Sequence, residues 1–172
     1  MRHSSDLIGK PVVTMDEGRF LGNVKDVFLD EGLNWLAGVY LGKEGFLRRK
    51  QLLIPREAVV VFGVDAILVN DADVVSDDRE TKEASSWIRL DSLRKRSVNT
   101  PGGTKVGVAG DVVLDGEARI IGFELSKVYV SGPIADERFI PRAALIDTGE
   151  EDGIMTVDLA KAERQKSVVG GQ

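Results

Sequence analysis

The stretch of sequence that decides the fold is GNVKDVFLD, from Gly22 to Asp30, which occurs again as GVAGDVVLD from Gly107 to Asp115. Both copies have a Gly, then an Asp four positions later, then three apolar residues and a second Asp. The second copy begins 85 positions after the first. A match of this length within one chain indicates an internal duplication.

A second phrase is duplicated at nearly the same spacing. Ile54-Pro55-Arg56-x-Ala58 returns 86 positions later as Ile140-Pro141-Arg142-x-Ala144. The repeated unit therefore has roughly 70 residues, which is close to the smallest size at which a domain folds by itself. We expect the two units to support each other.

Composition places the chain among ordinary globular proteins, with 172 residues of which 42% are hydrophobic and 30% charged. No apolar run approaches the roughly 18 to 20 residues that span a bilayer. Residues 1–6 also lack the apolar stretch of a signal peptide. We therefore expect a cytoplasmic protein without a membrane span, and peripheral association with a membrane stays open. The absence of cysteine excludes disulfides, zinc–thiolate sites and cysteine nucleophiles.

The charge balance bears on the choice of partners. The formal net charge is −5, whereas affinity for nucleic acids depends on neutralising phosphates with Lys and Arg. Direct RNA binding is therefore not expected. Basic clusters at 48–50 and 94–96 leave local contacts open, although such clusters commonly serve as solvated charge at strand edges.

Short apolar runs separated by Gly, Asp, Asn and Pro predict an all-β fold. Such small sheets must close or pack on a neighbour, so we expect two small β-barrels in tandem, a short linker helix and a C-terminal helix at 158–166. We divide the chain into a first barrel at 1–75, a helical linker at 76–89, a second barrel at 90–160, and a helix end and tail at 161–172. The strands are expected at 10–14, 22–29, 35–41, 50–55, 58–62 and 66–69, and at 97–99, 106–114, 118–129, 137–141, 144–147 and 154–157.

The duplicated residues have a structural interpretation. Asp26 and Asp111 interrupt apolar strands and can accept hydrogen bonds from nearby turn amides. Gly22 and Gly107 suit a positive φ or a closely approaching backbone. A catalytic or metal-binding carboxylate pair is disfavoured, because residues four apart on a strand are roughly 13 Å apart. We assign these four residues, with Pro55 and Pro141, to the scaffold.

Five motifs of the first half occur in a characteristic order: Leu7-Ile8-Gly9-Lys10-Pro11-Val12, the turn Asp16-Glu17-Gly18, Leu21-Gly22-x-x-x-Asp26-Val27, Val39-Tyr40-Leu41 and Leu53-Ile54-Pro55. With these motifs the first half resembles the PRC-barrel domain, which is named after the photosynthetic reaction centre. The second half, from about 90 to 158, resembles it more loosely, keeping Gly107, Asp111, Asp115 and Ile140-Pro141.

The resemblance implies an adaptor and no enzyme. PRC-barrels occur in the H subunit of purple bacterial reaction centres, in the ribosome-maturation factor and as stand-alone proteins, without a conserved active site. We therefore expect a non-catalytic protein-binding adaptor or assembly factor, without cofactor or metal, for a photosynthetic or other large complex. Two alternatives stay open: a ribosome-maturation or RNA-processing accessory barrel, and a structural protein that forms homodimers through a strand edge.

Features that suggest an enzyme are weak. The only histidine, His3, is expected in a mobile terminus where no second group orients it as a base. Pro101-Gly102-Gly103-Thr104-Lys105 lacks the upstream Gly and the strand–loop–helix context of a phosphate loop. The acids at 71, 73, 77 and 78 do not have the spacing of a calcium-binding loop.

A partner-binding surface should combine aromatic and cationic side chains on a loop. One segment of the first unit has this composition: Phe46, Leu47, Arg48, Arg49 and Lys50. The corresponding segment of the second unit, 130–139, is acidic instead. We predict that the first of these segments contacts a protein partner; the alternative is that Phe46 folds back onto the core.

Overall fold

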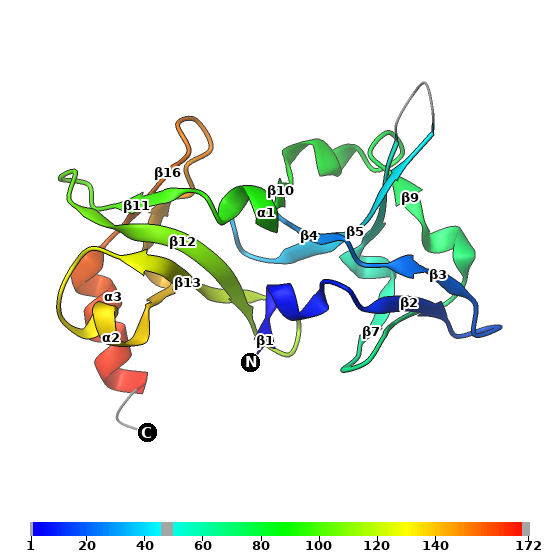
Figure 1. Cartoon of the computed structure of the whole chain (residues 1–172), viewed down its shortest axis with the longest axis horizontal. Coiled ribbons are helices and arrows are strands. Elements are labelled where there is room, and N and C mark those ends of the chain that lie inside the picture. The colour runs from blue at the N-terminus through cyan, green and yellow to red at the C-terminus, as the bar shows by residue number, and fades with distance from the viewer. Residues whose placement is uncertain (1, 46–49, 170–172) are drawn as a thin grey trace.

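The computed structural model describes residues 2–45 and 50–169, with side chains described as far as Arg164. Strands dominate it and form three sheets, with only short helices between them (Figure 1). The predicted all-β fold is thereby confirmed.

The first unit contains two sheets. Within them, neighbouring strands are antiparallel except for β2 and β8, which are parallel. One sheet has the order β3 (Phe20–Asn23), β2 (Pro11–Thr14), β8 (Ile67–Val69) and β7 (Val59–Phe62). The other has the order β10 (Ile88–Arg89), β4 (Asp26–Leu29), β5 (Leu36–Glu44), β6 (Lys50–Pro55) and β9 (Ser76–Asp77).

The second unit repeats this connectivity in one sheet. Its order is β14 (Phe139–Pro141), β13 (Ile120–Val128), β12 (Lys105–Leu114), β11 (Ser97–Asn99), β16 (Ile154–Val157) and β15 (Leu145–Asp147). The parallel pair of the first unit, β2 and β8, has its counterpart in β11 and β16. The structure thus has the same strand order twice, as the sequence duplication predicts.

The main difference between the units lies in the duplicated phrase. We expected one strand at 22–29, but the chain leaves β3 after Asn23 and enters β4 of another sheet at Asp26. Gly22 has a φ of 137°, which side-chain-bearing residues rarely adopt, so the chain changes direction there. In the second unit β12 continues through both segments and joins the two sheets into one.

Helical segments are short. The helix expected in the linker is only a 3-10 helix, η4 (Lys82–Ser86), whereas the C-terminal helix is confirmed as α3 (Leu159–Val169). Glu137 was expected to begin a strand but ends α2 (Pro133–Glu137), because Pro133 in the first turn favours a helix. The remaining segments are η1 (Ser4–Leu7), η2 (Arg56–Ala58), η3 (Ala72–Val74), α1 (Leu90–Leu93) and η5 (Arg142–Ala144).

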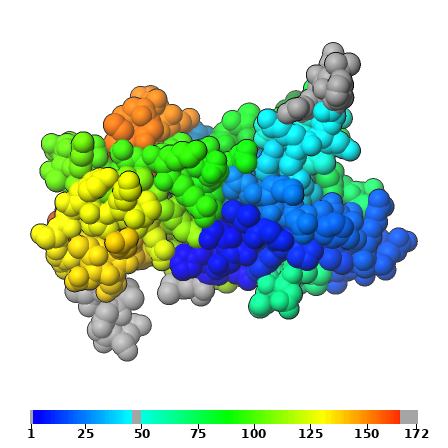
Figure 2. Space-filling model, in the orientation of Figure 1, coloured from blue at the N-terminus to red at the C-terminus, as the bar shows by residue number. Residues whose placement is uncertain are grey.

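The two units exchange their leading strands. Strand β1 (Arg2–His3) belongs to the first unit by sequence but pairs with β12 of the second, with Arg2 opposite Leu114. In return β10, which precedes the second unit, pairs with β4 of the first, with Ile88 opposite Leu29. Figure 1 shows the N-terminus beside β12, and in Figure 2 the dark blue N-terminal segment abuts the green second unit. The proposed domain ranges stay a prediction, and strand pairing crosses their boundary.

The duplicated Asp fastens each exchanged segment. Asp111 accepts hydrogen bonds from the Ser4 hydroxyl at 2.8 Å, from the Ser5 amide at 3.2 Å and from the Ser5 hydroxyl. Asp26 is only 2% exposed and accepts from Arg89 Nε at 3.0 Å. Each Asp also accepts from the amide that follows it, at 2.8 Å. The two Asp residues therefore accept hydrogen bonds from nearby amides, as predicted from the sequence. They also bond residues that precede the other unit, which was not predicted.

The apolar interior is continuous across the two units. One cluster of buried side chains includes Leu7, Val27 and Leu36 from the first unit together with Val112 and Ile120 from the second. A smaller cluster, Phe28, Ala37, Tyr40 and Leu53, lies against the linker residue Trp87. Separating the units would expose the larger cluster to water, so hydrophobic burial holds them together.

We predict that Arg89→Met destabilises the whole chain by about 2–4 kcal/mol, because it leaves the buried Asp26 carboxylate without its cation while keeping most of the side-chain stem. Urea unfolding followed by circular dichroism measures the change. The matched control is Lys95→Met, since Lys95 is 79% exposed and its Nζ forms only a weak ion pair with Asp91, at 4.0 Å. The control should stay within about 0.5 kcal/mol of the wild type. Equal effects of the two substitutions would contradict the role of Arg89.

Candidate functional site

The two units meet at the turns of their longest hairpins. The Leu36 amide donates to the Ala118 carbonyl at 2.9 Å, and the Ile120 amide donates to the Asn34 carbonyl at 2.8 Å. These bonds are reciprocal, and between them Trp35 of the first unit lies opposite Arg119 of the second. An approximate two-fold relation between the units therefore passes close to this pair.

The second Asp of each duplicated phrase shapes its turn. Asp30 Oδ1 accepts from the amides of Asn34 at 2.7 Å and Trp35 at 2.6 Å. Asp115 Oδ1 accepts from the amides of Arg119 at 2.9 Å and Glu117 at 2.8 Å. These amides, with that of Arg119 first, lower the pKa of Asp115. Both turns are therefore fixed by their own sequence.

The duplicated Ile-Pro-Arg phrase brings an arginine from each unit to the turn of the first. The guanidinium of Arg56 lies 4.5 Å from the Trp35 ring centroid, and that of Arg119 lies 4.7 Å from it. Arg142 donates to the carbonyls of Leu33 and Gly32, both at 2.8 Å. Pro55 and Pro141 end β6 and β14 and precede η2 and η5, so each proline sets the direction of the arginine after it. This supports their assignment to the scaffold.

A hollow of about 510 Å³ lies beside Trp35 and is also lined by Trp87. A neighbouring hollow of about 680 Å³ shares Asp30 and Trp87 with it. We call the two together the acidic trough, because acids outnumber the two cations of its lining, Arg56 and Arg142; the acids are Asp30, Glu31, Glu57, Glu80, Glu83, Asp147 and Glu150. Hydrogen bonding to the Glu31 carboxyl raises the pKa of Glu150, as expected where like charges crowd.

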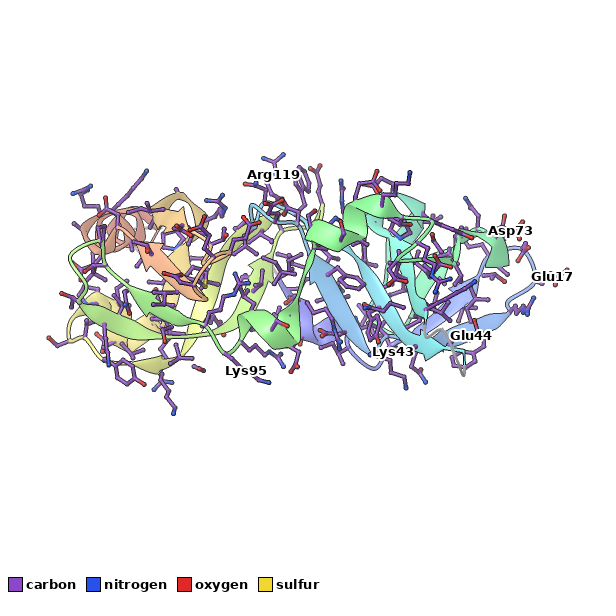
Figure 3. All side chains as sticks on the ribbon, turned by 90° about the horizontal axis from the view of Figure 1, so that it is seen from above. Glu17, Lys43, Glu44, Asp73, Lys95 and Arg119 are labelled. Atoms are coloured by element: carbon purple, nitrogen blue, oxygen red, sulfur yellow. The ribbon has the colours of Figure 1, made fainter. Side chains whose placement is uncertain are left out.

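The aromatic lining of the acidic trough is held in place. Trp87 packs against Phe28 with ring centroids 5.6 Å apart, and Phe28 meets Tyr40 edge to face at 5.7 Å. A side chain in place of Gly38 would come within 3.4 Å of the Trp87 ring. Trp87 thus anchors the linker against the first unit. Seen from above, Arg119 lies on the long side of the molecule away from Lys43 and Lys95 (Figure 3).

The scaffold residues predicted from the sequence have distinct roles. Gly22 is needed for its positive φ, whereas Gly107 is needed for space, because a Cβ there would lie 2.1 Å from the Lys127 carbonyl oxygen. The two structural reasons proposed for these glycines therefore apply to one glycine each.

The predicted partner-binding loop lies largely outside the described residues, because Phe46, Leu47, Arg48 and Arg49 are not among them. Lys50 is described; its exposed ammonium is 3.8 Å from Asp77, a weak surface contact. Hydrogen bonds from the amides of Glu80 and Arg79 lower the pKa of Asp77. Partner binding by this loop stays a prediction.

The acidic trough was not predicted from the sequence, because its residues come from both units and the linker. One signal could have pointed to it. The two hairpin turns meet at a position that is Trp35 in one copy and Arg119 in the other. This is a large chemical difference at equivalent positions of a duplicated turn.

The expectation for His3 is wrong. It lies in β1, and its Nε2 is 2.7 Å from Glu124 Oε1 of the second unit. This hydrogen bond, more than the nearby carboxylates of Glu124, Asp111 and Asp6, raises the pKa of His3, while burial opposes the change. Within the described ranges no group of three or more His, Cys, Asp or Glu side chains could hold a metal, and no helix is long and apolar enough to cross a membrane.

We predict that His3 stabilises the chain only at low pH. Its pKa is raised in the folded state, so the stabilisation is complete below the unfolded value near 6.5 and disappears as pH rises through the folded value. The pair is about 40% exposed on both sides, so the effect should be below about 1 kcal/mol. Melting temperatures of wild type and His3→Gln at about pH 5.5 and pH 8.5 measure it. The difference should shrink at the higher pH; a difference independent of pH would contradict the ion pair.

Residues 1–75 match the family described as PRC-barrel domain. The match confirms the resemblance and covers the residues of the first unit, while the second unit shares its strand order. No curated protein matches the chain.

Proposed function

We propose that this chain, whose first 75 residues form a PRC-barrel domain, is a non-catalytic protein-binding adaptor. In this proposal the acidic trough receives a basic segment of a partner protein. The observation that carries the proposal is the combination of Trp35, Trp87 and seven carboxylates around two adjoining hollows.

The chemistry of the acidic trough fits protein recognition. Tryptophan and arginine are the residues that most often dominate binding energy at protein interfaces. The surrounding carboxylates would steer a cationic segment and select its orientation. The guanidinium groups of Arg56 and Arg119 both lie over the Trp35 ring, so the position of this ring is fixed.

The interlocked scaffold supports the proposal because it reduces the cost of binding. Turns fixed by Asp30 and Asp115, and a Trp87 ring fixed by Phe28, have little conformational freedom left to lose. Binding to preorganised groups costs less entropy than binding to mobile ones. The same carboxylates disfavour a nucleic acid as the ligand, since phosphates would be repelled.

The identity of the partner follows only from the family. A subunit of a photosynthetic or other large complex is the partner class that the PRC-barrel resemblance supplies, and a ribosomal partner is the alternative. We retain the basic loop around Phe46 and Arg49 as a second proposed contact, of charge opposite to that of the acidic trough.

We predict that the double substitution Glu80→Lys and Glu83→Lys abolishes partner capture without lowering the melting temperature. Both residues are exposed, so reversing their charge should repel a basic segment while leaving the core intact. Tagged wild-type and variant chains are used as baits with extract of the native cell, and captured proteins are quantified by mass spectrometry.

The matched control is Glu17→Lys with Asp73→Lys, which makes the same charge change at exposed positions far from Arg119 (Figure 3). It should capture the partner as the wild type does. A third bait, Phe46→Ala with Arg49→Glu, tests the loop separately. Equal capture by the trough variant and the wild type would contradict partner binding in the acidic trough. If none of the baits captures a protein, the proposed adaptor function is contradicted.

A further inference from the structure

The exposed apolar side chains of the first unit gather around one edge strand. Strand β7 ends its sheet, and no strand of the described chain pairs with its outer side. Val60 is 47% exposed and Val61 43%, and Val64 in the turn that follows is 82% exposed. The sequence of β7, Val59-Val60-Val61-Phe62, contains no charge or proline. Charged residues and proline protect most free edges, and β7 has neither, although it carries a bulge between Val59 and Val61.

A groove of about 400 Å³ runs beside β7. It is lined by Arg2, by Val60, Val61 and Phe62 of β7, and by Leu114, Asp115, Gly116 and Ala118 of the second unit. Buried Leu7 and Leu36 contribute to its floor. Apolar side chains of an added strand could therefore be buried here as well as paired along the backbone.

Charge is distributed unequally along β7. At its C-terminal end Arg2 donates to the Phe62 carbonyl at 2.9 Å and Lys10 donates to the Gly63 carbonyl at 2.8 Å. Neither cation forms an ion pair with a described side chain. Burial, and then the proximity of Arg2, lower the pKa of Lys10, although Asp6 and Asp65 act in the opposite direction. At the N-terminal end Glu57 is 73% exposed and only loosely paired with Arg56, at 3.5 Å.

We infer that β7 is the interface of a symmetric homodimer, in which the β7 strands of two copies pair antiparallel. Residue 60 of one copy then lies opposite residue 61 of the other, and the Val side chains cover each other. The same arrangement brings Glu57 of each copy to the end of β7 that carries Arg2 and Lys10 in the other. A two-fold interface of this kind is complementary to itself in both shape and charge.

The equivalent edge of the second unit has the opposite design. Strand β15 exposes Ile146 at 59%, but Asp147 follows within the strand and Glu150, Glu151 and Asp152 follow in the turn. Two copies of this edge would repel each other. It lies on the upper side of the molecule in Figure 1, whereas β7 lies on the lower side. One edge is therefore available for pairing and the other is protected.

Sedimentation equilibrium of the full chain tests the dimer. A four-residue strand gives a small interface, so we expect the mass to rise from 18.7 kDa toward twice that value between about 5 and about 500 µM. Val60→Lys should weaken dimerisation at least about tenfold, because a charge is placed on the paired edge. The matched control Ile146→Lys makes the same change at the other edge and should leave dimerisation within about twofold.

A charge exchange tests the antiparallel orientation. Lys10→Glu alone should weaken the dimer by bringing acids together, and Glu57→Lys alone should weaken it by bringing cations together. The double variant should restore the wild-type constant, and melting curves of each variant confirm that it is folded. A monomer at every concentration, or a dimer that Val60→Lys does not weaken, would overturn the proposal; failure of the double variant to recover would overturn the orientation. Glu57 and Ile146 also line the acidic trough, but Val60 does not, so the effect of Val60→Lys on the dimer constant is separate from partner capture by the trough.

Discussion

The buried carboxylate of Asp26, with its counterpart Asp111, ties each unit to the segment that precedes the other. The Asp26 carboxylate is removed from water, so donors must compensate it, and Arg89 does so from the segment before the second unit. Asp111 is partly exposed and accepts from Ser4 and Ser5 in the segment before the first unit. Each donor lies in the segment that precedes the other unit in the sequence. The strand exchange, the continuous core and the meeting of the two hairpin turns follow from this constraint.

The interlocked arrangement also determines where the surface differs between the copies. The two Asp residues that fasten the units are equivalent in both copies, although their donors, Arg89 and Ser4 with Ser5, differ. Other residues have diverged between the copies. Where the hairpin turns meet, one copy has Trp35 and the other Arg119, and the sheet edge is apolar at β7 but acidic at β15. A duplicated scaffold can in this way keep its stability while each exposed surface takes on its own partner.

Most strands could be predicted because apolar runs bounded by Gly, Asp and Pro are a local signal. The exchanged strands could not, since β1 and β10 have two residues each and no periodicity, and Arg2 finds its partner Leu114 on the far side of the sequence. The split of the expected strand depends on the φ of 137° at Gly22. A glycine permits this φ, but its presence in the sequence does not predict it. The acidic trough was missed for a related reason, because Asp30, Glu83 and Glu150 become neighbours only when the units interlock.

Scanning calorimetry of the full chain is the most direct test that the two units form one interlocked body. One transition is predicted, with a calorimetric enthalpy near 120 kcal/mol, as expected from about 0.7 kcal/mol per residue near 60 °C, and an equal van't Hoff enthalpy. Two resolved transitions, or a van't Hoff enthalpy of about half the calorimetric value, would show units that unfold separately and would contradict the account.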